Sequence, residues 1–142
     1  MRDRVFVDTN VFVYLQSTSD GGKRGIAQRV IDELDCCVST QVLNEVSNVL
    51  ARKAGFSYVQ IGEVVDGIVQ TCEVTTVDYG TIRRAHGIAQ RYQLGYYDSL
   101  IISSALEAGC KTLLTEDLTD GQIIGRELTI LNIFDHPKFF DR

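Results

Sequence analysis

Residues 5–12 read VFVDTNVF, a β-branched apolar run that ends in an aspartate and leads into a second apolar run. The first three residues predict a short buried strand. Asp8 follows that strand directly, and a carboxylate beside a core element is costly to desolvate unless something pairs with it. The same arrangement recurs at Glu45 in STQVLNEVSNVL, Asp98 in LGYYDSLIISSA and Asp117 in TLLTEDLTDG. Since no matching cation lies in these segments, the four carboxylates indicate a bound divalent metal ion.

Short apolar runs and longer segments with helical spacing alternate along the rest of the chain. Strands are expected at residues 5–7, 36–38, 74–77, 111–114 and 128–133. Apolar residues recur every three or four positions in 26–34, 42–50 and 59–68, which predicts three amphipathic helices. Two further helices are expected at about 79–92 and 98–108.

Local signals predict where several of these helices begin and end. Ser57 is followed three residues later by Gln60, a pattern typical of a capping box at a helix start. Gly95 and Gly109 each follow an expected helix and suit the left-handed conformation that often ends one.

Strand–helix alternation with continuously apolar strands predicts an α/β fold. The expected architecture is a central, mostly parallel sheet of four to five strands with helices on both faces. Ligands of such sheets collect beyond the carboxyl ends of the strands. We therefore expect the four carboxylates to meet at one edge of the sheet.

The size and composition of the chain are those of an ordinary globular protein. Its 142 residues, 44% of them apolar and 23% charged, are interpreted as one domain spanning residues 1–142. No run approaches the roughly 18 apolar residues of a membrane span, and the first residues lack a signal peptide, so a cytoplasmic protein is expected. The spacing of Cys36, Cys37, Cys72 and Cys110 predicts reduced, buried thiols and no zinc site.

The charge of the chain limits how it could contact nucleic acid. Its net charge is −5 and its pI is near 4.9, whereas proteins that coat nucleic acid non-specifically are usually basic. Any nucleic-acid contact must therefore be local, metal-bridged or helped by a basic partner. Solvated helix faces are the simpler interpretation of the basic residues that could line such a contact. These are Arg24, Arg29, Arg52, Lys53, Arg83, Arg84 and Arg91.

Carboxylates without neighbouring thiols or imidazoles predict a particular class of metal. Oxygen ligands suit Mg²⁺ or Mn²⁺, while soft metals prefer Cys or His, and the chain has only His86 and His136. Two such ions roughly 4 Å apart can activate a water and stabilise the leaving oxygen of a phosphodiester. Clustered carboxylates also repel one another and an RNA backbone, so activity should depend strictly on the ion.

Each carboxylate also has a purely structural explanation. Asp8 and Asp98 can cap helices, and Asp117 can open a turn. Glu45 lies mid-helix, where an exposed Glu is a good helix former. Taken together, the order and placement of the four favour a site.

Other polar and aromatic residues are weaker candidates. His86 and His136 could act as general bases in a metal-free mechanism, but the sequence shows no positioned partner for either. Tyr96 and Tyr97 could stack on RNA bases, although burial beside the last helix is expected instead.

Four motifs in order resemble the PIN-domain nucleases. They are V-D-T-N-V-F after the first strand, N-E-V in a helix, Y-Y-D-S-L-I-I-S-S-A and L-L-T-E-D-L-T-D-G. The pattern is most similar to the VapC-type ribonuclease toxins of bacterial and archaeal toxin–antitoxin pairs. The resemblance runs from about residue 5 to residue 133, and its specificity comes from the order and intervals of the motifs.

The resemblance implies roles for the four carboxylates as catalytic, metal-ligating residues. Asp8 and Asp98 would hold the principal metal ion. Glu45 and Asp117 would complete the site and help to position the attacking water.

Several neighbouring residues match supporting positions of the family. Thr9 and Asn10 match the small polar residues after the first Asp, where Asn10 would orient that carboxylate. Thr115 matches a hydroxyl residue two positions before the last Asp. Asp120 is a candidate outer ligand, and Glu116 is a third carboxylate of the same segment.

The function that the resemblance implies is a Mg²⁺- or Mn²⁺-dependent endoribonuclease that hydrolyses RNA phosphodiester bonds. As a VapC-type toxin, it would form a homodimer and be silenced by a cognate antitoxin protein. Two alternatives stay open: a PIN-type nuclease of RNA processing or DNA repair, and a non-catalytic acidic pocket that binds a basic partner segment. Phosphatase chemistry on an Asp nucleophile is disfavoured because the first motif reads D-T-N rather than D-x-D.

Overall fold

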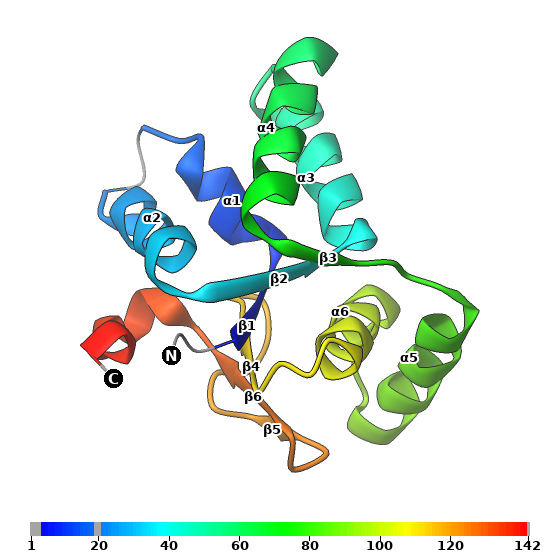
Figure 1. Ribbon diagram of the computed structural model, residues 1–142. Coiled ribbons are helices and arrows are strands. Elements are labelled where there is room, and N and C mark those ends of the chain that lie inside the picture. Colours follow the sequence, from blue (N-terminus) through cyan, green and yellow to red (C-terminus); the bar gives the residue numbers. More distant parts are fainter. Residues whose placement is uncertain (1–3, 19–20, 142) are drawn as a thin grey trace.

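A six-stranded sheet forms the centre of the computed structural model, which describes residues 4–18 and 21–141 (Figure 1). In chain order the strands are β1 (Arg4–Val7), β2 (Asp35–Ser39), β3 (Glu73–Thr75), β4 (Thr112–Leu114), β5 (Ile123–Ile124) and β6 (Leu128–Leu131). The spatial order is β3-β2-β1-β4-β6-β5, and all neighbours pair in parallel except β5 and β6. The predicted α/β fold is confirmed. The sheet has one strand more than expected, because the two residues of β5 are too few to show a periodic pattern.

Helices lie on both faces of this sheet. They are α1 (Thr9–Leu15), α2 (Lys23–Glu33), α3 (Thr40–Lys53), α4 (Tyr58–Thr71), α5 (Tyr79–Tyr92) and α6 (Tyr96–Glu107), followed by the 3-10 helices η1 (Ile133–Asp135) and η2 (Pro137–Asp141). Figure 1 shows α1 and α2 on one side of the strands and α6 on the other, with α5 outside α6 and the α3–α4 pair projecting beyond the sheet. None of the helices in the described ranges is long and apolar enough to cross a membrane.

The sheet core continues directly into the edge that carries the acidic motifs. Val5, Phe6 and Val7 are fully buried, as expected for a strand covered on both faces. The backbone N–H of Asp8 donates to the carbonyl of Leu114 at 3.1 Å, which extends the β1–β4 ladder by one residue. The segment after each strand is therefore positioned by the sheet itself.

Most of the signals predicted for helix ends are present, and one left-handed residue was predicted at the wrong position. Ser57 and Gln60 form the predicted capping box, and Gly109 has the predicted left-handed backbone with φ 73°. Gly95 does not, because α5 ends at Tyr92, as predicted, and the left-handed turn follows at once. Gln93 takes the left-handed conformation with φ 56°, while Gly95 is extended and precedes α6. The Gln93 and Leu94 N–H groups both donate to the carbonyl of Ala89. These hydrogen bonds offset the steric cost of a left-handed backbone in a residue that has a side chain.

Two predicted strands end earlier than expected. The strand predicted at 74–77 is the three-residue β3, and the strand predicted at 128–133 stops at Leu131. There the Asn132 side chain accepts a hydrogen bond from the Phe134 N–H and starts η1. All four cysteines are buried and free, as predicted.

The left-handed Gln93 gives a prediction about stability. Replacement by Gly removes the steric cost of this backbone in a residue with a Cβ, so Gln93→Gly should raise the free energy of unfolding by about 0.5–1 kcal/mol. Urea denaturation measures the change. Gln90→Gly, an exposed position inside the same helix, should instead cost about 1 kcal/mol. Equal losses from both substitutions would contradict the assigned helix end.

Candidate active site

The four carboxylates line one cavity at the carboxyl edge of the sheet. Asp8 follows β1, Glu45 lies on α3, Asp98 lies on α6 and Asp117 lies in the loop after β4. The cavity has a volume of about 230 Å³, and its other lining residues are Thr9, Asn10, Asn48, Val49 and Ile101. The structure therefore brings together four segments that are far apart in the sequence. Their catalytic and metal-binding roles stay a prediction.

Asp8 is the most buried of the four, with only 5% of its surface exposed. One of its oxygens accepts a hydrogen bond from the backbone N–H of Thr9 and the other accepts one from the Thr115 hydroxyl, each at 2.7 Å. Burial raises the pKa of Asp8 to about 6, against the lowering effect of these two donors, and the nearby Asp117 and Glu45 carboxylates raise it further. Asp8 also caps α1, as its structural explanation predicted. The same residue can therefore cap the helix and line the cavity.

Glu45 is held by two neutral donors from different elements. Its Oε2 accepts a hydrogen bond from the Thr9 hydroxyl at 2.7 Å, and its Oε1 accepts one from the Gln41 amide at 2.9 Å. Gln41 is 7% exposed and its Nε2 also donates to the carbonyl of Tyr97 at 3.4 Å. Gln41 was not among the residues predicted from the sequence. Its position four residues before Glu45, on the same helix face, was the available signal.

Asp98 and Asp117 complete the acidic lining of the cavity. Asp98 lies in the first turn of α6, whose N-cap is Gly95. Partial burial raises the pKa of Asp98, and the Asp117 and Glu45 carboxylates raise it further. The Asn10 amide lies 3.3 and 3.4 Å from the two oxygens of Asp117. Asn10 therefore donates to the last carboxylate, and not to Asp8 as the resemblance implied.

Thr115 connects the first and the fourth carboxylate. Its hydroxyl donates to Asp8 and accepts a hydrogen bond from the backbone N–H of Asp117 at 3.1 Å. Only 3% of Thr115 is exposed, and its own N–H bonds to the carbonyl of Leu131 at 3.1 Å. One buried hydroxyl thus fixes the relative positions of two acidic side chains.

The other two carboxylates of this segment point elsewhere. Asp120, the candidate outer ligand, accepts a hydrogen bond from the Asn132 N–H at 2.8 Å and lies 2.7 Å from His136, and both contacts lower its pKa. Glu116 contacts Lys23 at 2.9 Å and accepts a hydrogen bond from the Tyr14 hydroxyl. Neither lines the cavity. The bend at 116–118 turns successive side chains in different directions, which the sequence could not show.

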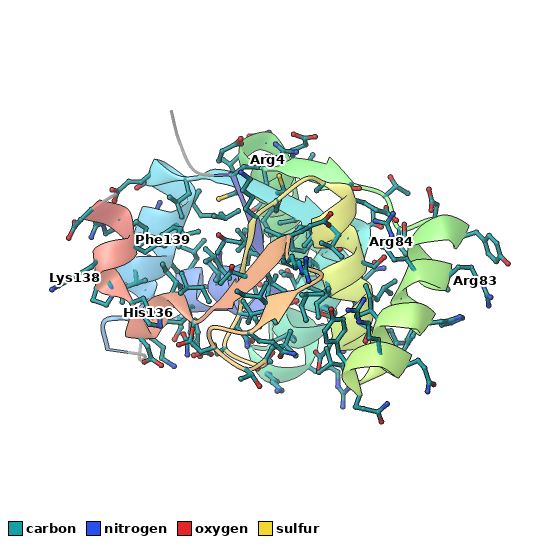
Figure 2. The ribbon with its side chains drawn as sticks, turned by 90° about the horizontal axis from the view of Figure 1, so that it is seen from below. Arg4, Arg83, Arg84, His136, Lys138 and Phe139 are labelled. Carbon is teal, nitrogen blue, oxygen red and sulfur yellow. The ribbon has the colours of Figure 1, made fainter. Side chains whose placement is uncertain are left out.

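The weaker candidates lie outside the cavity as well. Figure 2 shows His136 at the end of the molecule opposite Arg83 and Arg84. His86 is exposed on α5. Tyr96 and Tyr97 are exposed, at 36% and 66%, so the burial expected for them is wrong. α6 begins at Tyr96, and these two residues form its outer first turn.

The four carboxylates suit a hard divalent cation as ligands, although three of them accept hydrogen bonds from other side chains or from the backbone. Within the described ranges, no ion pair engages any of the four. Nor do any three Asp, Glu, His or Cys side chains among those residues already form a group that could hold a metal ion. Repelling carboxylates turn to neutral donors, as Glu45 does to Thr9 and Gln41. Oxygen ligands around one acidic cavity are those that Mg²⁺ and Mn²⁺ prefer.

Comparison with known families gives one match. The family model of the PIN domain matches residues 5–119, which include all four carboxylates. None of the curated proteins matches the sequence significantly.

Several solved structures share the fold at low sequence identity. VapC20 of Mycobacterium tuberculosis, a toxin that cleaves the sarcin–ricin loop, is 20% identical with a TM-score of 0.65, over 80% of this chain and 91% of that chain. A toxin–antitoxin complex from Klebsiella pneumoniae is 18% identical with a TM-score of 0.67, over 90% and 96%. DNA-bound VapBC from Salmonella typhimurium is 20% identical with a TM-score of 0.63, over 90% and 96%. At these identities the likeness shows a common fold.

The buried Asp8 gives a prediction about stability and pH. Its pKa is raised from 3.8 to about 6, so the folded protein binds this proton more tightly than the unfolded chain. Between pH 4 and pH 7.5 the metal-free protein should lose on the order of 2 kcal/mol of stability that Asp8→Asn does not lose. Urea denaturation in EDTA at both pH values measures the difference.

Asp120→Asn is the matched control for this experiment. Because the pKa of Asp120 is lowered in the folded protein, its contribution to stability is lost only as the pH falls below about 4, so this variant and the parent should have nearly parallel profiles between pH 4 and pH 7.5. If Asp8→Asn and the parent have parallel pH profiles, the environment assigned to Asp8 is wrong.

Proposed function

Because the chain belongs to the PIN domain family, we propose that it is a Mg²⁺- or Mn²⁺-dependent endoribonuclease that hydrolyses RNA phosphodiester bonds. The observation that carries this proposal is the convergence of four carboxylates, from four separate segments, on one cavity. If these residues were only helix caps or surface glutamates, nothing would require them to line the same cavity.

Asp8 and Asp98 are the proposed holders of the principal metal ion, and Glu45 and Asp117 complete the set. A bound divalent ion supplies Lewis acidity, which favours attack by water and stabilises charge on the phosphate. Two hydrogen bonds hold Asp8 in one orientation. Asp98 shows no such bond within the described residues, so it is free to turn toward a ligand.

Glu45 and Asp117 are proposed to orient the attacking water. Both carboxylates line the cavity and each receives hydrogen bonds from neutral amide or hydroxyl donors. Neutral donors fix the direction of a carboxylate without cancelling its charge. Gln41 and Asn10 are therefore positioning residues for Glu45 and Asp117.

The proposed biological role is that of a VapC-type toxin with a cognate antitoxin and a homodimeric assembly. Support comes from the shared fold with VapC20, a toxin, and with complexes of toxins and antitoxins. An acidic cavity would also attract a basic antitoxin side chain, because four carboxylates concentrate negative charge there. Expression of the parent, but not of the Asp98→Asn variant, should arrest growth, and mapping of cleaved RNA ends would identify the target.

A second candidate function is the non-catalytic capture of a basic segment. The observation that favours it is that no three acidic side chains in the described part of the chain form a ready metal site. A binder of this kind would hold its partner equally well in EDTA. Titration with Mg²⁺ or Mn²⁺ and an RNA-cleavage readout separates the two functions.

Asp98→Asn should abolish metal-dependent cleavage and keep the fold. The substitution is isosteric but removes a charged metal ligand, so the rate of RNA cleavage should fall by more than ~100-fold. Circular dichroism should be unchanged, and the rise in melting temperature caused by Mn²⁺ should shrink. Asp120→Asn removes a carboxylate outside the cavity and should cleave at the parental rate. Parental cleavage by Asp98→Asn would refute the mechanism.

Thr115 should be required for its hydroxyl and not for its bulk. Thr115→Val keeps the volume but leaves a buried Asp8 oxygen without its donor, so the metal affinity inferred from Mn²⁺-dependent cleavage should fall about 10–100-fold. Thr115→Ser retains a hydroxyl and should stay close to the parent. Equal behaviour of the two variants would show that the hydrogen bond to Asp8 is unimportant.

A further inference from the structure

An exposed aromatic surface lies beside the acidic cavity. It consists of Tyr96 and Tyr97 on the first turn of α6 and His86 on α5, here called the aromatic strip. The ring centroids of Tyr96 and Tyr97 are 5.2 Å apart, and those of His86 and Tyr96 are 5.6 Å apart. Tyr97 is 66% exposed. A ring this open contributes little to the core, which leaves its face available to a ligand.

The strip is attached to the cavity by covalent and hydrogen bonds. Tyr97 directly precedes Asp98, a cavity residue. The Tyr97 carbonyl accepts a hydrogen bond from Gln41, whose amide also donates to Glu45. The backbone of Tyr97 is therefore fixed relative to two of the proposed catalytic carboxylates, Asp98 and Glu45.

The helix that carries His86, α5, is positively charged, although the chain as a whole is acidic. Residues 79–95 contain Arg83, Arg84 and Arg91 but no Asp or Glu, in a protein of net charge −5. Figure 2 shows Arg83 and Arg84 on α5. The Arg83 guanidinium lies 3.4 Å from the His86 ring and forms no ion pair with any described residue. An uncompensated arginine beside exposed rings suits a phosphate that follows a stacked base.

We propose that the aromatic strip is the platform on which one base of single-stranded RNA stacks, with Arg83 contacting the adjacent backbone; this rests on the proposed ribonuclease function. Open rings recognise the face of an unpaired base, whereas paired bases hide theirs inside a duplex. The acidic cavity repels the RNA backbone, and the platform supplies attraction one residue away. Tyr97 is thus a substrate-positioning residue, distinct from the carboxylates.

Steady-state cleavage of a short unstructured RNA tests the platform. Tyr97→Ala should raise KM about tenfold or more, the loss expected for one base–aromatic stack, while kcat falls far less. Tyr97→Phe retains the ring and should restore the parental KM. Tyr58→Ala removes another exposed tyrosine (82% exposed) from the start of α4 and serves as the matched control. An unchanged KM for Tyr97→Ala would overturn the proposal.

A fluorescence measurement tests stacking without relying on cleavage. The chain contains no Trp, so Tyr97→Trp in an Asp117→Asn background carries a single reporter. Added oligoribonucleotide should quench its fluorescence, and replacing one nucleotide by an abasic site should remove most of that quenching. Quenching that persists with every abasic position would also overturn the proposal.

The two proposals fail in different ways. If the parent cleaves RNA but Tyr97→Ala and the Trp reporter respond as the control does, the platform is wrong and the ribonuclease function stands. If the reporter is quenched but the parent cleaves no RNA with Mg²⁺ or Mn²⁺, the ribonuclease function is wrong and the strip binds RNA without hydrolysis. A change in sedimentation mass for Tyr97→Ala, with unchanged KM, would make the strip a protein interface and overturn the platform.

Discussion

Four carboxylates that repel one another share the cavity at the carboxyl edge of the sheet, and neutral donors hold three of them, Asp8, Glu45 and Asp117. Burial of Asp8 beside Asp117 and Glu45 raises its pKa, so gathering these charges costs folding free energy. The side chains around them supply hydroxyl and amide groups instead of cations. Such donors orient the carboxylates and leave their charge available, which is the condition for binding a divalent ion or a basic partner.

The buried sheet makes this crowded arrangement possible. Asp8 and Thr115 extend the parallel ladders of β1 and β4, since their N–H groups bond to the carbonyls of Leu114 and Leu131. Their side chains are therefore fixed by the same backbone hydrogen bonds that order the core, and a rigid core resists the repulsion. Glu45 and Asp98 lie on α3 and α6, two helices that contact the sheet. The arginines of α5, the helix beside α6, lie outside the cavity. There they can attract an RNA substrate without neutralising the carboxylates.

Much of the fold could be predicted from the sequence, because each element carries its own signal. The apolar run at 5–7, the helical spacing in 59–68 and the Ser57 capping box are local patterns, and the structure contains all three. The left-handed backbone of Gln93 and the short β5 could not be predicted. In those places hydrogen bonds to the preceding turn or the neighbouring strand outweigh intrinsic preference, and a window of a few residues does not reveal them.

The sequence by itself determined which four carboxylates follow apolar elements, and in what order, since residue type and spacing along the chain are sufficient for that. Only the tertiary structure decided which donor each one meets. Asn10 pairs with Asp117 instead of Asp8, Asp120 turns to His136, and Tyr97 faces solvent. These outcomes depend on contacts between residues up to 107 positions apart. Chain folding sets such distances, and no periodicity within a single segment contains them.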